Sequence, residues 1–366
     1  MKIAFVINAR LVSGAEEHLL DLTTKLPACG IEPFFLVRAG SGLEKRLKEC
    51  GIRSYPAFVP SRLKTIANLS RALVQEQPDI VSVNREHNLY PSYLSFCLAL
   101  PFLRKKPKLA AVFHTPTGRH YPLLSSLYDG VIATSEYTGS SFWSKNPGLQ
   151  QITSIIHYGI ELPGLQVDKN DMSRERRLLK GRKFPVIAMV GELWKNQEEL
   201  VDATVSLRES FPDITVAIVG GGSTETLQKK IAEYGLESTV LLTGRIPREQ
   251  IPDLFFDCDL SVSTHRNEGF GIVHIESLAA RTPVVAYNCG GLVEVIKEGG
   301  GVLVDGTTAD FCREVVALLR DHERREALGA EGRAVVEANF TVEQMVRKHA
   351  EFYRKLSRNG IEQGRV

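Results

Sequence analysis

The chain has 366 residues, of which 43% are hydrophobic and 24% charged, and a formal net charge of +2. This length exceeds what one ordinary core fills, so we expect two α/β domains of a globular protein. The near balance of charge argues against a dedicated nucleic-acid binder.

The cysteines and the apolar runs bear on the compartment. The six cysteines are scattered without a C-x-x-C pair, so we expect reduced thiols, with neither a metal nor a disulfide framework. The apolar runs are too short to span a bilayer, and the N-terminus lacks the features of a signal peptide. We therefore expect a cytoplasmic protein.

In the N-terminal part, short apolar runs alternate with amphipathic segments. Strands are expected at 3–7, 33–37, 80–83, 109–113, 130–133 and 152–156, and helices at 16–26, 43–49, 63–75 and 90–103. This alternation predicts a parallel, doubly wound sheet. The first strand-to-helix loop contains Gly14 and lies at the carboxyl end of a strand, where open α/β sheets place ligands.

A second α/β unit follows a polar, charged stretch. Its strands are expected at 186–190, 215–219, 240–242, 260–263, 284–286 and 302–304, and its helices at 197–209, 224–234, 248–255, 272–280, 292–297, 308–320 and 324–336. A long amphipathic helix is expected at 342–356. We predict an N-terminal domain (1–165), a linker (166–183), a C-terminal domain (184–341) and a C-terminal helix segment (342–366).

The strongest chemical motif combines two carboxylates with a glycine-rich helix start. Glu268 and Glu276 flank Gly269-Phe270-Gly271, after which Ile272 opens an apolar helix. Glycines let the backbone approach a ligand closely, and the free N–H groups of the first helical turn favour an anion. Carboxylates repel phosphate but accept hydrogen bonds from neutral hydroxyls. Phosphate and hydroxyls together describe a sugar nucleotide.

The run from Glu268 to Glu276 continues into Pro-Val-Val-Ala at 283–286, Gly290-Gly291 and Glu294. In this order the residues resemble the donor-site signature of the family-4 retaining glycosyltransferases, or glycosyl transferases group 1. The resemblance covers nearly the whole chain, more loosely in the N-terminal part. It implies the GT-B fold, in which two Rossmann-like domains face a deep cleft and the last helix crosses back onto the N-terminal domain.

The resemblance also implies residue roles. Glu276 would accept both ribose hydroxyls of the nucleotide, and Glu268 would bind hydroxyls of the donor sugar. The backbone of Gly269, Phe270, Gly271 and Ile272 would meet sugar and phosphate. The alternatives from the residues alone are a core salt bridge for Glu276 and charge capping of the helix N-terminus for Glu268.

Two basic residues are candidates for binding the diphosphate. Lys195 follows the first strand of the second domain and can stabilise the charge of the leaving group, although a solvated surface lysine is the alternative. The family usually has an arginine after the glycine of this loop, and this chain has Glu192. Arg245 is a candidate to compensate. Glu192 either points away from the site or pairs with Lys195 or Arg245.

Two positions in the N-terminal domain match residues near the family's reaction centre. His114 ends a strand and matches the cleft histidine that contacts the donor sugar or the acceptor; a structural histidine is the alternative. Gly14 resembles part of the family's Gly-Gly-Ala-Glu loop, with Ser13 in place of the first glycine.

Two further motifs are expected to be structural. Asp257-Cys258-Asp259 spells the D-x-D of metal-dependent glycosyltransferases but lacks the context of a metal loop. The glycine run at 220–222 resembles a dinucleotide turn, yet no acidic ribose ligand follows at a strand end. We therefore predict neither a metal nor a bound cofactor.

The resulting hypothesis is a retaining, metal-independent glycosyltransferase with a UDP or GDP sugar as its donor substrate. The expected acceptor is a glycan, a lipid-linked molecule or a small molecule, in the synthesis of cell-envelope polysaccharide, lipopolysaccharide or glycolipid. Two alternatives are a sugar-nucleotide epimerase on the same fold and a catalytically weak nucleotide-binding or assembly protein.

Charge is distributed unevenly along the sequence. Residues 1–165 carry 18 Lys and Arg against 12 Asp and Glu, and the remainder carries 27 against 31. The densest basic cluster, at 104–108, follows the apolar segment 91–102. Ordinary scatter is one interpretation; the other is a basic N-terminal face for peripheral contact with anionic lipid or for an anionic acceptor.

Overall fold

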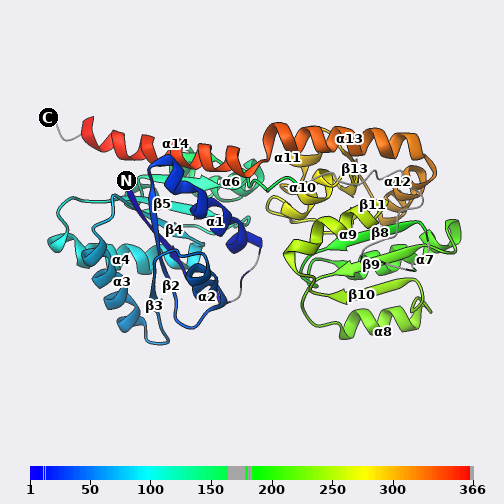
Figure 1. Cartoon of the computed structure of the whole chain (residues 1–366), viewed down its shortest axis with the longest axis horizontal. Coiled ribbons are helices and arrows are strands. Elements are labelled where there is room, and N and C mark those ends of the chain that lie inside the picture. Colours follow the sequence, from blue (N-terminus) through cyan, green and yellow to red (C-terminus); the bar gives the residue numbers. More distant parts are fainter. Residues whose placement is uncertain (11, 13, 164–177, 180, 182–183, 363–366) are drawn as a thin grey trace. The chain divides into compact units, whose positions relative to one another are not determined.

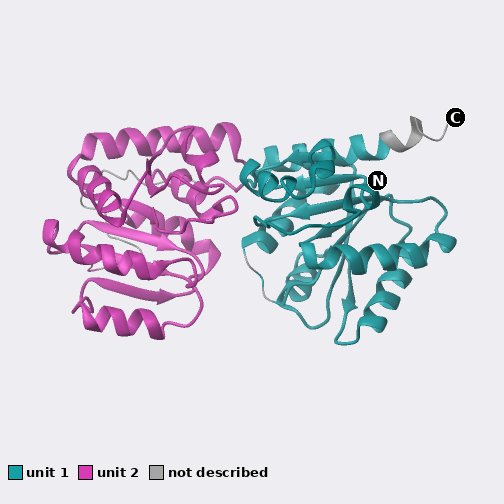
Figure 2. Ribbon diagram, turned by 180° about the vertical axis from the view of Figure 1, so that it is seen from behind, with its two compact units in different colours: residues 1–159, 342–366 teal, residues 160–341 magenta. Residues whose placement is uncertain are grey.

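The computed structural model describes the chain except residues 11, 13, 164–177, 180, 182–183 and 363–366. It divides into two compact units, here called unit 1 (residues 1–159 and 342–366) and unit 2 (160–341) (Figure 2). The linker predicted at 166–183 lies mostly outside the described residues. Within the described part, no helix combines the length and apolarity that crossing a membrane requires.

Unit 1 is built on a seven-stranded parallel sheet in the order β3-β2-β1-β4-β5-β6-β7 (Figure 1). Its strands are β1 (Lys2–Ile7), β2 (Glu32–Arg38), β3 (Ser54–Phe58), β4 (Ile80–Asn84), β5 (Lys108–Phe113), β6 (Gly130–Ala133) and β7 (Thr153–Ile155). The strand order reverses between β1 and β4. In such a sheet, the crevice outside the carboxyl ends of these two strands is where ligands bind.

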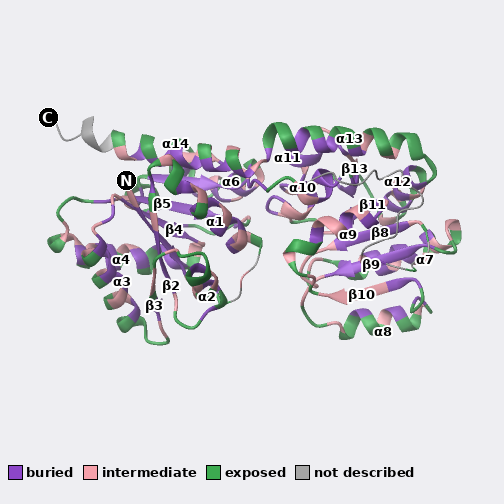
Figure 3. Ribbon diagram, viewed as in Figure 1, coloured by how far each residue is buried: buried purple, intermediate pink, exposed green. Residues whose placement is uncertain are grey.

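Helices cover both faces of this sheet, as the burial of its strands requires (Figure 3). They are α1 (Gly14–Lys25), α2 (Gly42–Glu49), α3 (Arg62–Glu76), α4 (Leu89–Ala99), α5 (Leu124–Leu127), α6 (Glu136–Trp143) and α14 (Val342–Glu362). Serine side chains cap three of them: Ser41, Ser61 and Ser135 each accept a hydrogen bond from a first-turn N–H. Helix α14 completes unit 1, where its buried Tyr353 hydroxyl lies 3.0 Å from Ser82 Oγ on β4.

Unit 2 has a six-stranded parallel sheet in the order β10-β9-β8-β11-β12-β13. Its strands are β8 (Val186–Val190), β9 (Thr215–Val219), β10 (Val240–Gly244), β11 (Leu260–Ser263), β12 (Val284–Tyr287) and β13 (Gly301–Val304). Its helices are α7 (Gln197–Ser210), α8 (Glu225–Glu233), α9 (Ile251–Asp257), α10 (Ile272–Ala279), α11 (Val293–Ile296), α12 (Thr308–Arg320) and α13 (His322–Asn339). Here the order reverses between β8 and β11, and open sheets of this kind bind ligands outside the carboxyl ends of the two strands at the reversal.

The sequence prediction misses β3, α5 and α6, and it misplaces the ends of several helices. Strand β3 lies at the edge of the sheet and pairs with β2. An edge strand tolerates a proline such as Pro56, because one side of the strand donates no hydrogen bonds to a neighbour. The helix predicted at 90–103 ends at Ala99 and continues as a 3₁₀ turn, Leu100–Phe102, since Pro101 lacks the N–H that an α-helix needs. The helix predicted at 248–255 likewise begins as a 3₁₀ turn.

Candidate functional site

Three loops meet at the carboxyl edge of the unit 2 sheet, around the point where its strand order reverses. The loop after β8 joins the loop after β9 through Leu193 N–H, which donates to Gly221 O at 2.9 Å. It joins the loop after β11 through Thr264 Oγ, which donates to Asn196 O at 2.7 Å. The segments that carry Lys195 and Glu268 are therefore held together by hydrogen bonds of the protein itself.

Lys195 and Glu268 form an ion pair at this reversal point. Lys195 Nζ lies 2.6 Å from Glu268 Oε2, and the two side chains are 20% and 14% exposed. Burial acts to raise the pKa of the Glu268 carboxyl, but the Lys195 ammonium outweighs it and holds that pKa below its usual range. The structure thus brings together one cation suited to phosphate and one carboxylate suited to hydroxyls.

The start of helix α10 lies directly beyond Glu268. Gly271 caps the helix with φ of +90°, a conformation that favours glycine, and Ile272 is its first residue. Gly269 and Phe270 are buried, and Phe270 packs edge-on against Phe340. Glu276, one turn into the helix, is half-buried. The backbone of residues 269–272 therefore belongs to the same loop as the Lys195–Glu268 pair.

His274 is a residue of this helix that sequence reasoning did not select. Its side chain is buried, and among the described residues its Nδ1 has no hydrogen-bond partner. Burial lowers the pKa of His274 to about 4, so the ring is neutral at physiological pH. A buried polar atom without a partner is uncommon in native proteins, and this one lies beside the candidate site.

Arg245 and Glu192 pair with each other, which decides between the alternatives for Glu192. Arg245 Nη2 lies 2.6 Å from Glu192 Oε1. The guanidinium packs over the glycine loop at 220–222, where a Cβ on Gly221 would come within 2.2 Å of Arg245 Nε. The arginine is 55% exposed and so is accessible to a ligand. The glycine run serves this close approach.

Glu199 is a second residue that the motif search missed. Its carboxylate accepts hydrogen bonds from Arg266, from Tyr287 Oη at 2.5 Å and from Thr308 Oγ at 2.9 Å. Burial acts to raise the pKa of Glu199, but these donors lower it to about 2. Arg266 also stacks 3.8 Å from the centre of the Tyr287 ring. Since α7 follows Lys195 and Arg266 precedes Glu268, Glu199 clamps the two segments that carry the pair.

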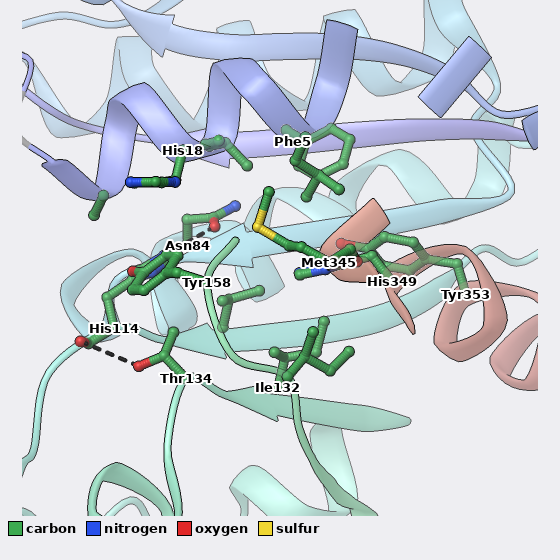
Figure 4. Close-up of a pocket in the computed structure, with 15 residues that line it drawn as sticks. Phe5, His18, Asn84, His114, Ile132, Thr134, Tyr158, Met345, His349 and Tyr353 are labelled. Carbon is green, nitrogen blue, oxygen red and sulfur yellow. Dashed lines mark hydrogen bonds between the residues drawn. The ribbon is translucent and has the colours of Figure 1, made fainter. Parts of the chain in front are cut away.

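In unit 1, His114 lies directly after β5 and lines a small pocket with residues of β1, β4 and α14 (Figure 4). Its Nδ1 lies 2.5 Å from Tyr158 Oη and its Nε2 lies 3.1 Å from Asn84 Oδ1. Burial, aided by the charge of Arg85, lowers the pKa of His114 to about 4. Both ring nitrogens are therefore engaged within unit 1, and a ligand hydrogen bond to His114 has to replace one of these contacts.

The reversal point of unit 1 also holds a charged pair that the sequence did not predict. Gly14 begins α1, and Glu16, two residues later, is fully buried and accepts a hydrogen bond from Arg85 Nε at 2.9 Å. Arg85 follows β4 with φ of +68°, a strained conformation for this residue type. Its side chain remains 35% exposed. Ser13, which replaces a family glycine in this loop, lies outside the described residues.

The D-x-D sequence has structural hydrogen bonds in this fold. Asp257 accepts from the N–H groups of Leu178 and Leu179 at 2.7 and 3.0 Å, and Asp259 accepts from Val186 N–H at 2.8 Å. Within the part of the chain that is described, no group of three or more His, Cys, Asp or Glu side chains is placed to hold a metal ion.

Two family models match the chain. Residues 171–335 match the model described as "Glycosyl transferases group 1", and residues 12–162 match "Glycosyltransferase Family 4". A "GDP-mannose-dependent alpha-(1-6)-phosphatidylinositol monomannoside mannosyltransferase" of Mycolicibacterium smegmatis is 34% identical over 217 residues, 56% of each chain. The "Lipopolysaccharide core biosynthesis mannosyltransferase LpsB" of Rhizobium meliloti is 30% identical over 273 residues, 69% of this chain and 74% of the relative.

The match thus spans 56% of the length of the mycobacterial relative, and 62% of that of its Mycobacterium tuberculosis counterpart. Solved structures match over a larger part of the chain. A glycosyltransferase from Rickettsia africae superposes with a TM-score of 0.81 at 20% identity, covering 97% of this chain and 98% of that one. Anabaena Alr3699/HepE in complex with UDP and glucose superposes with a TM-score of 0.80 at 22% identity, covering 96% and 98%. These likenesses, together with the two parallel sheets, confirm the predicted GT-B fold class.

Proposed function

We propose that this chain, which belongs to the glycosyl transferases group 1 family, moves a hexosyl unit from a nucleotide-diphosphate sugar to an acceptor hydroxyl. The observation that carries the proposal is the Lys195–Glu268 pair beside the α10 N-terminus. A cation, a run of backbone N–H groups and a carboxylate lie in one loop system, and they suit a diphosphate joined to a sugar.

The donor we propose is GDP-mannose. The mycobacterial relative is GDP-mannose-dependent by name, and the Rhizobium relative is named a mannosyltransferase of lipopolysaccharide core biosynthesis. Both names support an acceptor in glycolipid or lipopolysaccharide synthesis. The relatives reported above are all glycosyltransferases, so the epimerase alternative gains no support from them.

In the reaction we propose, the bond between the sugar C1 and the oxygen of the β-phosphate breaks while the acceptor oxygen bonds to C1 on the same face. The acceptor proton passes to the departing phosphate oxygen, and the anomeric configuration is retained. Lys195 and Arg245 would neutralise the growing charge of the diphosphate. Glu268 would orient the sugar through its hydroxyls, and Glu276 would bind the ribose.

When the donor binds, Arg245 would release Glu192 and bind the diphosphate instead. In the present structure the Arg245 guanidinium forms an ion pair with the Glu192 carboxylate. A diphosphate offers more acceptor oxygens and more negative charge, and a guanidinium matches phosphate geometry in a bidentate manner. Arg245 would then serve as the second diphosphate clamp, in place of the arginine that Glu192 replaces.

Metal independence is part of the proposal. It is supported by the backbone hydrogen bonds of Asp257 and Asp259, which occupy the carboxylates of the D-x-D sequence. Turnover should continue after treatment with EDTA. Complete loss of activity that manganese or magnesium restores would contradict this part of the proposal.

For the compartment, we propose the cytoplasmic face of a membrane. All six cysteines are free thiols in the structure, which suits a reducing environment. The acceptor class named by the relatives would bring the enzyme to a lipid surface.

Two measurements test the function. Thermal-shift titrations with GDP, UDP and ADP should show the largest stabilisation with GDP, because only the cognate nucleotide makes all contacts of the donor site. Turnover is then measured with a panel of nucleotide sugars and membrane-extracted acceptors, with product release of the nucleoside diphosphate as readout. Stabilisation by none of the three nucleotides would contradict the donor site. Conversion of a sugar nucleotide in the absence of any acceptor would favour epimerisation instead.

A further inference from the structure

Helix α4 exposes an apolar stripe to solvent. Tyr90, Leu94, Leu98 and Phe102 are 42%, 49%, 54% and 68% exposed, and they recur at intervals of four residues from α4 into the 3₁₀ turn that follows it. We call these four residues the α4 stripe. Side chains four apart lie on one face of a helix, so the four are neighbours on the surface.

The opposite face of the same helix is already used for packing. Leu89, Phe96 and Ala99 are buried in the core of unit 1, and Ser95 O accepts a hydrogen bond from Ser70 Oγ of α3 at 2.9 Å. The α4 stripe is therefore additional to the core. From Leu89 to Leu103 the chain contains no charged residue. A helix that is apolar all round is ordinarily buried, in protein or in lipid.

Basic residues adjoin the α4 stripe. Arg104, Lys105 and Lys106 follow Phe102 and are exposed, and Arg104 N–H is anchored to Gln77 Oε1 at 2.8 Å. Helix α3 packs beside α4 (Figures 1 and 3). It exposes Arg62, Lys64 and Arg71.

Carboxylates are missing from the exposed positions of both helices. Glu76 is the acidic residue of α3, and it is buried and paired with Lys2 and Arg53. Residues 89–106 contain no Asp or Glu. The exposed surface of the two helices is thus apolar and positive, which is complementary to an anionic lipid headgroup above a hydrocarbon layer.

We propose that the α4 stripe and Arg104, Lys105 and Lys106 dock unit 1 on a bilayer that contains anionic lipid. The four apolar side chains enter the headgroup–acyl boundary, and the basic residues contact lipid phosphates. The purpose of docking rests on the proposed function, because a lipid-linked acceptor is presented at that surface. Docking itself requires neither nucleotide nor sugar, so it is tested apart from glycosyl transfer.

The test is co-sedimentation of the purified full chain with vesicles, without substrates. Binding is expected to vesicles of phosphatidylcholine mixed equally with phosphatidylglycerol, to be weaker with phosphatidylcholine alone, and to fall as salt is added. The double variants Leu94→Glu/Leu98→Glu and Lys105→Glu/Lys106→Glu should each lower partitioning by about tenfold or more.

The matched control is Lys229→Glu/Lys297→Glu, which changes two exposed lysines of unit 2 and alters the net charge as much as Lys105→Glu/Lys106→Glu does. It should bind vesicles as the unchanged chain does. Melting temperature and nucleotide-induced thermal shift show that each variant is folded and that unit 2 is intact. Absence of vesicle binding by the unchanged chain, or equal binding by all variants, would overturn the proposal. A further contradicting outcome is an unchanged chain that is dimeric and does not bind vesicles, and that becomes monomeric with Leu94→Glu/Leu98→Glu. The α4 stripe would then be an interface between two copies of the chain.

Discussion

Lys195 Nζ and Glu268 Oε2 lie 2.6 Å apart although 73 positions separate the two residues in the sequence. Each follows a strand that flanks the reversal point of the unit 2 sheet, so the topology brings them together. Removing one partner of a largely buried ion pair leaves the other charge uncompensated. The pair is therefore the position where a substitution should reveal most about the proposed donor site.

Lys195→Ala should lower kcat/KM by roughly 10²–10³-fold, because the departing diphosphate loses a cation positioned for its growing charge. Steady-state kinetics with the donor nucleotide sugar checks this. Lys229→Ala, which removes an exposed lysine of α8, serves as the control and should behave like the unchanged enzyme. Normal turnover by Lys195→Ala would mean that the diphosphate is held elsewhere, with Arg245 and the α10 N-terminus as the remaining candidates.

Glu276→Ala should weaken binding of the cognate nucleoside diphosphate by about 10- to 150-fold. This factor corresponds to the roughly 1.5–3 kcal/mol that a hydrogen bond to a charged group contributes. Calorimetric titration gives the affinity directly. Glu298→Ala removes an exposed carboxylate just beyond α11 and is the matched control. An unchanged affinity of Glu276→Ala would refute the assignment of this residue to the ribose.

Glu192→Ala should tighten nucleotide binding by about fivefold, the equivalent of one exposed ion pair, because the carboxylate no longer competes for Arg245. Arg245→Ala should weaken binding, and the double variant should show that the two effects are not additive. The same titration measures all three variants. If Glu192→Ala had no effect in the presence of Arg245, the guanidinium would not be a ligand of the diphosphate.

Glu199→Gln should lower kcat more than it raises KM. The substitution removes the charge that holds Arg266 and Tyr287, so the Glu268 segment is less well positioned, while the side chains of Lys195, Arg245 and Glu276 that we propose as nucleotide ligands are unchanged. Tyr287→Phe removes one of the same hydrogen bonds and should show a smaller effect. Glu198→Gln, at the exposed neighbouring position, should leave both constants unchanged. Equal kinetics of Glu199→Gln and Glu198→Gln would show that the clamp does not position the site.

Stability should fall as the pH drops below about 6.5, the ordinary pKa of histidine. His114, His274 and His349 are neutral in the folded chain because burial lowers the pKa of each to about 4. On acidification, these histidines become protonated in the unfolded chain below pH 6.5, whereas in the folded chain they stay neutral down to about pH 4. Each histidine therefore reduces the free energy of unfolding by about 1.4 kcal/mol per pH unit between pH 6.5 and 4.

Melting temperatures across that pH range check the prediction. His349→Gln is the informative variant, because His349 lies on α14 and its Nδ1 donates to the helical carbonyl of Met345 at 2.9 Å. The variant should show a shallower decline of melting temperature with acidification than the unchanged chain. Parallel curves would contradict the inference that His349 is neutral when buried.

The sequence by itself predicted both parallel sheets and most of their strands, and it supplied the motif on which the proposed donor site rests. Parallel strands buried on both faces are nearly continuous apolar runs, and these runs are visible without any tertiary information. The Glu268-to-Glu276 segment was identifiable because its glycines and carboxylates are adjacent in the chain. Local patterns of this kind can be recognised in the sequence because the residues that form them are close together along the chain.

Two of the elements that it missed, β3 and α6, lack such a pattern. Strand β3 carries a proline that ordinarily argues against a strand, and only its place at the sheet edge permits it. Helix α6 is rich in small and hydroxyl-bearing residues, which favour turns and loops over helices, and it is stabilised by the Ser135 cap. In both cases the tertiary position overrides the local preference of the residues.

What only the tertiary structure decided is which charges meet. Glu192 could have faced Lys195, Arg245 or solvent, and the fold pairs it with Arg245. Glu199 and Arg85 do not lie in a recognisable motif. In the structure, Glu199 joins the segments that carry Lys195 and Glu268, and Arg85 pairs with the buried Glu16. Their partners are far away in sequence, and ion pairs depend on separations of a few ångströms that composition and spacing do not encode. The sequence determined the chemistry available to this protein, and the crossover of its strands determined where that chemistry is assembled.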